Sequence, residues 1–202
     1  MTLRLLVADD QALVRSALAA LLSLEADFTV VAEVGRGDEV VAAARRHQPD
    51  VALLDIEMPG IDGLEAAAAL TAAVPSCRVL VLTTFGRPGY LRRAMESGAL
   101  GFVVKDAPAE QLADAVRRVA AGERVVDPAL AAATLAHGPS PLTDRERGVL
   151  VAARRGATVA DIADALHLSE GTVRNYLSSA IVKTGARNRV EAATVADTRG
   201  WL

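Results

Sequence analysis

The 202-residue sequence has few of the features that mark secreted, disulfide-stabilised or membrane-spanning proteins. Its single cysteine, Cys77, excludes an internal disulfide and fits a reducing compartment. No apolar run approaches the roughly 18–20 residues that cross a bilayer. The early apolar run Leu5–Ala8 ends at two aspartates, which neither a signal peptide nor a membrane helix would tolerate. Apolar residues still make up 51% of the chain, enough for two small cores, so we expect a soluble, cytoplasmic protein.

Lysine is scarce, and charge is unevenly distributed. Of the 22 basic residues only Lys105 and Lys183 are lysines, so each is a candidate for a site that needs a compact ammonium. Residues 1–122 hold 12 basic and 16 acidic residues (net −4), whereas residues 142–202 hold 9 and 7 (net +2). Residues 171–189 contain four basic residues and no acid. The net charge of −3 argues weakly against a nucleic-acid partner, but this basic stretch favours one.

Hydrophobic patterning predicts two domains, residues 1–121 and 142–202, joined by a linker over 122–141 with one short helix near 128–136. In the first domain short apolar runs alternate with amphipathic stretches, which predicts a five-stranded parallel sheet covered by helices on both faces. The expected strands are 3–8, 28–34, 51–54, 78–83 and 101–104, and the expected helices are 11–24, 37–47, 62–73, 88–97 and 108–121. The second domain lacks strand signals and predicts four helices, at 143–155, 159–166, 170–184 and 188–198.

Polar residues stand at the carboxyl ends of four of the expected strands. They are Asp9, Asp10, Asp55, Thr83 and Lys105. Because right-handed crossovers bring the carboxyl ends of parallel strands to one edge, we expect all five side chains to converge there. Crowded carboxylates repel one another unless a cation joins them, and oxygen ligands favour Mg²⁺. A carboxylate can also accept a phosphoryl group, whose charge an ammonium and a hydroxyl would help to neutralise.

This pattern resembles the receiver domain of two-component response regulators. The matching residues are Asp9-Asp10, Asp55 followed by Met58-Pro59 and Asp62-Gly63, Thr83, and Lys105-Asp106. The resemblance implies a flavodoxin-like doubly wound fold over residues 1–121, with Asp55 as phosphoacceptor and Thr83 and Lys105 as phosphoryl-binding groups. It further implies Mg²⁺ bound by Asp9, Asp10, Asp55 and the backbone carbonyl of Glu57, and a switch formed by Thr83 and Phe102. Phe102 lacks the hydroxyl of a tyrosine, and it could also be a plain core residue.

The C-terminal segment contains the signals of a helix-turn-helix. Thr143 and Glu146 are spaced as a capping box, Thr158 is a candidate N-cap, and a three-residue turn separates the helices expected at 159–166 and 170–184. The second of these helices would enter the major groove of DNA. Together with LTDRE at 142–146, SEGTVRNY at 169–176 and ARNRVEA at 186–192, this arrangement resembles a LuxR-type DNA-binding domain. The whole chain is therefore similar to the NarL/FixJ class of response regulators.

The resemblance assigns DNA contacts residue by residue. Arg174, Asn175 and Ser178 match base-facing positions, and arginine and asparagine can pair with guanine and adenine. The resemblance also places five residues near phosphates: Thr158, Thr172, Lys183, Arg187 and Asn188. It further implies that residues 188–198 form a helix used in dimerisation. Tyr176, Val182 and Thr184 depart from the family's usual residues. A narrower resemblance, in residues 55–60 and 82–90, is to the branch that includes regulators of membrane-lipid desaturation.

These observations predict a transcription factor rather than an enzyme. A sensor histidine kinase would phosphorylate Asp55, and the receiver would then dimerise, through either the helix four–strand five–helix five face or the helix one–helix five face, and bind double-stranded DNA. RNA polymerase is a further candidate partner. Three alternatives stay open: an aspartyl-phosphate phosphatase, disfavoured because Glu57 stands where a second aspartate is usual; an output module that binds RNA or protein; and a regulator that works without phosphorylation.

Overall fold

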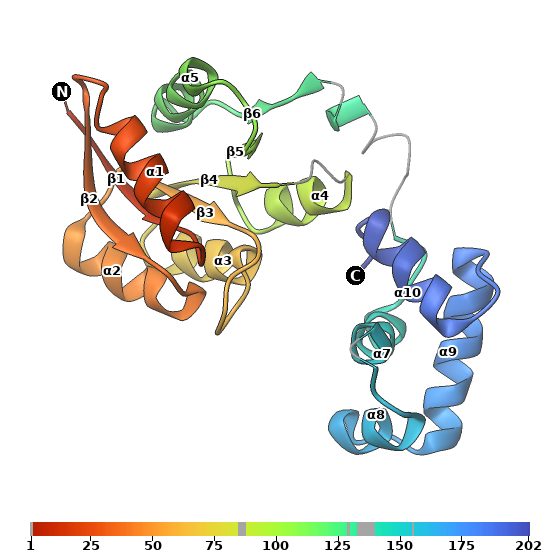
Figure 1. Ribbon diagram of the computed structural model, residues 1–202. Helices are drawn as coiled ribbons and strands as arrows, with labels where there is room; N and C mark the ends of the chain where they lie inside the picture. The colour runs from red at the N-terminus through yellow and green to blue at the C-terminus, as the bar shows by residue number, and fades with distance from the viewer. Residues whose placement is uncertain (1, 85–87, 129, 133–139, 155) are drawn as a thin grey trace. The chain divides into compact units, whose positions relative to one another are not determined.

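The computed structural model describes residues 2–84, 88–128, 130–132, 140–154 and 156–202. They form two compact units, a parallel α/β unit and a smaller helical one, and the main division falls between Leu130 and Ala131 (Figure 1). The short helix expected near 128–136 and the motif at 82–90 lie partly outside the described residues. Among the helices that are described, none is both long and apolar enough to cross a membrane.

The first unit is built on a six-stranded parallel sheet with the order β2-β1-β3-β4-β5-β6. The strands are β1 (Leu3–Ala8), β2 (Phe28–Val34), β3 (Val51–Asp55), β4 (Arg78–Thr83), β5 (Gly101–Val104) and β6 (Val125–Val126). The central strand β3 is buried along its whole length, as the apolar run at 51–54 predicts. The order of the strands in the sheet and their parallel pairing confirm the doubly wound architecture.

The expectation of five strands was wrong by one. The two residues of β6 pair in parallel with Gly101 and Phe102 of β5 and extend the sheet within the segment predicted as linker. The backbone N–H of Val125 donates to the carbonyl of Leu100 at 2.9 Å. Two residues are too few to produce the apolar alternation that identifies a strand in sequence.

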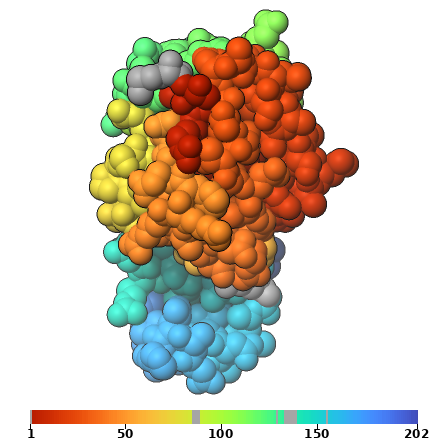
Figure 2. All heavy atoms as spheres, turned by 90° about the vertical axis from the view of Figure 1, so that its left-hand side faces the viewer, coloured from red at the N-terminus to blue at the C-terminus, as the bar shows by residue number. Residues whose placement is uncertain are grey.

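Helices cover both faces of this sheet (Figure 1). They are α1 (Ala12–Leu22), α2 (Val40–His47), α3 (Gly63–Ala73) and α5 (Ala109–Ala120), and a short 3-10 helix, η1 (Gly37–Glu39), precedes α2. A further helix, α4 (Pro88–Glu96), lies between β4 and β5 along the chain. The apolar sides of α1 and α5 share one buried cluster with alternate residues of the strands. Seen from the β2 edge, the red-to-orange N-terminal segments cover most of the visible face of this unit (Figure 2).

The second unit contains α7 (Asp144–Arg154), α8 (Val159–Leu166), α9 (Glu170–Thr184) and α10 (Arg189–Thr198), which confirms the predicted all-α domain. A side chain caps each of these helices: Thr143 for α7, in the predicted capping box with Glu146, Thr158 for α8, Ser169 for α9 and Asn188 for α10. The helices α8 and α9 form the predicted helix-turn-helix, because α8 ends at His167 in a left-handed conformation (φ 53°) and Ser169 begins α9 two residues later. The apolar core of the unit includes Leu150, Ile162, Val173, Leu177 and Trp201.

Candidate functional site

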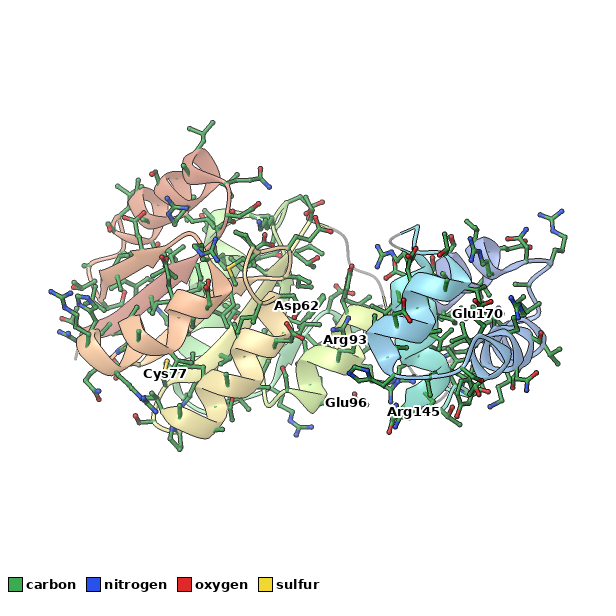
Figure 3. The ribbon with its side chains drawn as sticks, turned by 90° about the horizontal axis from the view of Figure 1, so that it is seen from below. Asp62, Cys77, Arg93, Glu96, Arg145 and Glu170 are labelled. Atoms are coloured by element: carbon green, nitrogen blue, oxygen red, sulfur yellow. The ribbon has the colours of Figure 1, made fainter. Side chains whose placement is uncertain are left out.

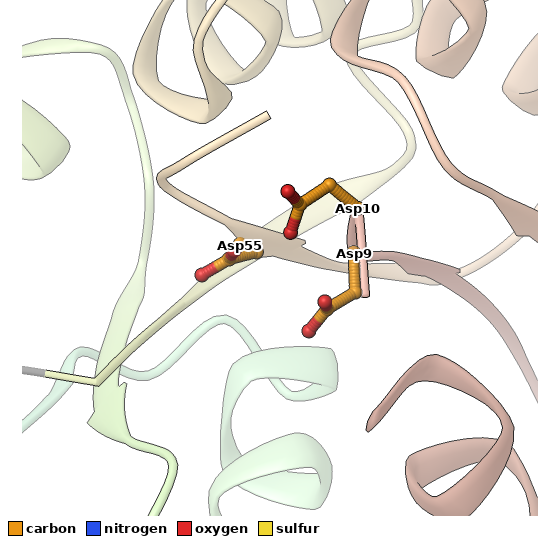
Figure 4. A group of neighbouring side chains, drawn as sticks. All are labelled: Asp9, Asp10 and Asp55. Carbon is orange, nitrogen blue, oxygen red and sulfur yellow. The ribbon is translucent and has the colours of Figure 1, made fainter. Parts of the chain in front are cut away.

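Three aspartates meet at the carboxyl edge of the sheet. Asp9 and Asp10 follow β1 directly and Asp55 is the last residue of β3, and these two strands are neighbours that pair Ala8 with Leu54. The three side chains each offer one carboxylate oxygen within 4.8 Å of the others (Figure 4). Asp9 and Asp55 are buried, whereas Asp10 is exposed to solvent. Two of the three charges therefore lie where water cannot screen them.

Lys105 brings its ammonium between the two buried carboxylates. Its Nζ atom lies 2.7 Å from Oδ2 of Asp9 and 3.0 Å from Oδ1 of Asp55. The backbone N–H of Lys105 donates to the carbonyl of Thr83 at 2.7 Å, which anchors the residue at the end of β5. Burial would lower the pKa of Lys105, but hydrogen bonds to Asp9 and Asp55 outweigh it and raise that pKa. Burial acts in the opposite direction on Asp55 and raises its pKa, although the hydrogen bond from Lys105 opposes this rise.

The donor set suits a hard divalent cation. All three grouped side chains are carboxylates, and one of them is open to solvent, which leaves room for the waters that Mg²⁺ usually keeps. Asp9 also accepts a hydrogen bond from the backbone of Gln11 at 2.9 Å, which orients its carboxylate. Glu57, whose backbone carbonyl was predicted as a further ligand, is exposed in the loop that follows β3.

Thr83 and Phe102 occupy neighbouring strands on the same side of the sheet. The register pairs Val81 with Phe102 and Thr83 with Val104. Since paired residues of parallel strands point to the same face and Thr83 is two residues beyond Val81, Thr83 and Phe102 share a face. Both are buried, with Phe102 only 1% exposed. Phe102 also lines a pocket of about 490 Å³ beside α5 and β6.

Two arginines that sequence reasoning missed hold the loops around the acidic cluster. Arg15 of α1 donates to the backbone carbonyl of Asp9 at 2.6 Å, which fixes the loop between β1 and α1. Arg93 of α4 pairs with Asp62 at 3.2 Å, and Asp62 is the N-cap of α3 (Figure 3). Neither arginine belongs to a local motif, so no sequence signal could have identified these contacts.

The helix-turn-helix presents the predicted base-facing residues to solvent. Arg174, Asn175 and Ser178 are all exposed, and their spacing puts them on one side of α9. The opposite side of α9 is buried in the core through Val173 and Leu177. A helix with a buried apolar side and an exposed polar side can lie in a groove without disturbing its own packing.

The residues predicted near phosphates fall into three situations. Thr158 and Asn188 are N-caps, and the Thr172 hydroxyl lies 2.8 Å from that of Ser169 at the start of α9. Arg187 is fully accessible, with its side chain 87% exposed, and pairs with Glu191. Lys183 differs from them, because its ammonium lies 2.8 Å from the buried carboxylate of Glu146.

Comparison with known proteins agrees with both halves of this description. The profile of the response regulator receiver domain matches residues 5–117, and that of the bacterial regulatory proteins of the luxR family matches residues 140–196. The transcriptional regulatory protein YvfU of Bacillus subtilis is 44% identical over 99% of this chain and 100% of its own, and DesR of the same organism is 43% identical over 97% of each.

A solved structure, the response regulator ChrA of a heme-sensing two-component system, is 33% identical, with a TM-score of 0.59 over 100% of this chain and 99% of its own. Relatives of nearly equal identity carry different names, so the narrower resemblance to one branch stays a prediction. The profiles and the full-length relatives agree on the same two domains in the same order. The chain belongs to the two-component response regulators that carry a receiver domain and a LuxR-family DNA-binding domain, and it is a transcriptional regulator.

Proposed function

We propose that a sensor histidine kinase activates this regulator by phosphorylating Asp55. The phosphorus–nitrogen bond of the kinase phosphohistidine breaks as an Asp55 carboxylate oxygen bonds to phosphorus, which leaves an acyl phosphate. Asp9, Asp10, Asp55 and the Glu57 carbonyl would hold Mg²⁺, which when bound neutralises charge on the transferred phosphoryl oxygens. The observation that carries this proposal is the buried Asp55 within 4.8 Å of two further carboxylates and 3.0 Å from the Lys105 ammonium.

Lys105 and Thr83 complete the proposed phosphoryl site. Lys105 now bonds to the carboxylates of Asp9 and Asp55, and its three N–H donors can turn to phosphoryl oxygens once Asp55 is modified. Thr83 offers a hydroxyl from the end of β4. Because Phe102 shares a face of the sheet with Thr83, a movement of Thr83 changes the space available to the Phe102 ring. Because Phe102 also pairs with Val126 of β6 and borders the pocket there, phosphorylation is thereby coupled to the β5–β6 edge of the sheet.

On the output side, we propose that α9 enters the major groove of double-stranded DNA. Arg174 and Asn175 would read base edges, with Ser178 beside them, while Thr158, Thr172, Arg187 and Asn188 would fix the register on phosphates. The exposure of Thr158, Arg187 and Asn188 supports this assignment. The positions of Thr158 and Asn188 as helix N-caps support it further. Such a protein acts in the cytoplasm, where it meets DNA, its kinase and RNA polymerase.

We further propose that activation produces a homodimer, which grips two half-sites at once. Of the two candidate faces, α1 has the stronger support. Its exposed side includes Leu13, Ala17 and Ala20, continued by Leu24 just beyond its end, and these positions form one stripe without any charge. Leu13 and Leu24 are 83% and 85% exposed, the two highest values among the large apolar residues that the structure describes. An apolar stripe of this kind commonly marks an interaction surface.

The stripe is self-complementary in an antiparallel pairing of two α1 helices. A two-fold axis near its middle sets Leu13 against the partner's Leu24 and Ala17 against the partner's Ala20, and the alanines let the helices approach closely. α1 has no acid in its first turn and no base in its last. Antiparallel packing offsets the two uncompensated helix dipoles, and it brings Glu25 near the partner's helix N-terminus.

The decisive experiment compares Asp55→Asn with wild type. We expect beryllofluoride with Mg²⁺ to convert wild type to a dimer that binds duplex DNA, and Asp55→Asn to stay unresponsive, as measured by light scattering and electrophoretic shift. Glu39→Gln, which removes an exposed acid from η1 and leaves α1 and α5 unchanged, serves as the matched control. Normal DNA binding by Asp55→Asn would mean control by a route without phosphorylation. A shift with RNA but not duplex DNA, or rapid turnover of phosphate esters, would favour the other two alternatives.

A further inference from the structure

The carboxylate of Glu146 is buried at the junction of α7 and the recognition helix α9. The residue is only 3% exposed. On its own helix it belongs to a capping box, in which the backbone N–H of Thr143 donates to its Oε2 at 2.7 Å and its own N–H donates to the Thr143 hydroxyl. A capping box alone would leave the carboxylate at the surface, and burial of this one therefore requires further partners.

Those further partners both come from α9. The Ser179 hydroxyl donates to Oε1 of Glu146 at 2.6 Å, and the Lys183 ammonium donates to Oε2 at 2.8 Å. Ser179 and Lys183 are one turn apart, so the carboxylate is held to two successive turns of α9. Burial would raise the pKa of Glu146, but the hydrogen bonds from Lys183, Ser179 and Thr143 outweigh it and lower that pKa to about 2.

The ammonium of Lys183 is therefore already paired with a buried carboxylate, although Lys183 itself lies at the surface. Its side chain is 33% exposed, against 87% for Arg187, which the DNA-contact assignment treats in the same way. If Lys183 left Glu146 for a phosphate, an ionised carboxylate would stay buried without a counter-ion, a costly arrangement. A phosphate contact at the protein surface contributes much less free energy than the loss of this counter-ion would cost.

We propose that Lys183 is the counter-ion of Glu146 rather than an anchor on the DNA backbone, and that the Glu146–Ser179–Lys183 cluster positions the recognition helix. The cluster fixes the rotation of α9 about its own axis and its axial position relative to α7. It thereby fixes the direction in which Arg174 and Asn175 point. This assignment replaces the phosphate contact expected for Lys183 from the sequence. It rests on the proposed binding of duplex DNA by α9.

The salt dependence of DNA binding tests this proposal, because each phosphate-bound cation adds about 0.9 to the slope of log K against log salt. The probes are a duplex selected from a random pool on the beryllofluoride-activated full chain, and a scrambled duplex. We expect Lys183→Met to keep the wild-type slope while the ratio of selected to scrambled affinity falls. Glu146→Gln should free the ammonium and steepen the slope by about 0.9. Arg187→Met is the matched control and should flatten the slope by the same amount.

A Lys183→Met slope flatter by about 0.9, like that of Arg187→Met, would overturn the proposal, as would a Glu146→Gln slope equal to that of wild type. If either single variant does not fold, as judged by circular dichroism, the double variant Glu146→Met/Lys183→Met buries an apolar pair instead. Its slope should equal that of wild type, and a flatter one would also refute the idea. Failure of activated wild type to bind any duplex would refute the proposed function itself, a separate and recognisable result.

Discussion

Lys105→Met tests the electrostatics of the acidic cluster most directly. The substitution keeps much of the side chain's length but removes the ammonium that lies within 3.0 Å of both buried carboxylates. Removing one partner of a buried ion pair costs about 3–5 kcal/mol. The Lys105 side chain is 11% exposed and its partners only 1% and 4%, so most of this cost should apply. We expect the free energy of unfolding of the receiver unit to fall by about 3 kcal/mol in the absence of divalent ions.

Mg²⁺ should reverse much of that loss. In wild type the cation would compete with the ammonium for Asp9 and Asp55, whereas in Lys105→Met it would meet unneutralised carboxylates. We therefore expect Lys105→Met to bind Mg²⁺ at least tenfold more tightly, about 1.4 kcal/mol. At a hundredfold excess over its dissociation constant, Mg²⁺ would return about 2.7 kcal/mol of stability.

Urea unfolding with and without MgCl₂ measures both effects, and titration calorimetry measures the Mg²⁺ affinity. Arg124→Met removes one positive charge from an exposed position and is the control for net charge. If Lys105→Met were as stable as wild type without Mg²⁺ and bound the ion no more tightly, the ammonium would not be neutralising the acidic cluster.

Cross-linking, acid titration and glycine replacement test three other features of the structure. Leu13→Cys/Leu24→Cys should form an intermolecular disulfide on activation, detected by non-reducing electrophoresis, whereas each single variant should not, since each residue faces the other across the two-fold axis; equal cross-linking of the singles would exclude this register. The pKa of Glu146, lowered from 4.5 to about 2, contributes about 3 kcal/mol of stability above pH 4.5 that is lost as the pH falls toward 2. Fluorescence of Trp201, the one tryptophan, should report this acid transition, and Glu146→Gln should lack that pH dependence. Gly63→Ala puts a methyl carbon 1.8 Å from the carbonyl oxygen of Asp55, so phosphorylation should fail and stability should fall by about 2 kcal/mol. Gly171→Ala, whose added carbon meets only Ser169 at 3.8 Å, should behave as wild type, and normal phosphorylation of Gly63→Ala would show that the loop tolerates the shift.

The fold was largely predictable because its signals are local. The apolar runs of β1, β2, β4 and β5 have the expected bounds, and β3 is longer by one residue, Asp55 itself. Helix ends agree within two residues except at the start of α2, where the first three residues of the predicted helix form the 3-10 helix η1. The agreement is good because cap residues such as Thr158 and Asn188 directly precede the helices that they cap. The exception is β6, where Val125 and Val126 become a strand only through pairing with β5. Nothing in so short a segment distinguishes a strand from a linker.

The convergence of the acidic side chains at one edge of the sheet could also be predicted from the sequence. Parallel strands joined by right-handed crossovers must bring their carboxyl ends together, so Asp9 and Asp55 meet although 46 residues separate them. The stabilising partners were not predictable, since Arg15 reaches a backbone carbonyl and Arg93 reaches Asp62 across a different connection. Long arginine side chains leave no periodic trace in sequence, and their partners depend on which loops lie within reach.

Sequence by itself determined the two-domain organisation, the parallel sheet, the helix-turn-helix and the residue types of the phosphoryl site, because these depend on periodicity and on strand order. Tertiary structure alone decided the partner of each charge. Lys105 and Lys183 look alike as rare lysines, yet one bridges two aspartates and the other neutralises Glu146 from a neighbouring helix. The physical reason is that an ion pair is set by distance in space and by burial, and a linear sequence contains neither.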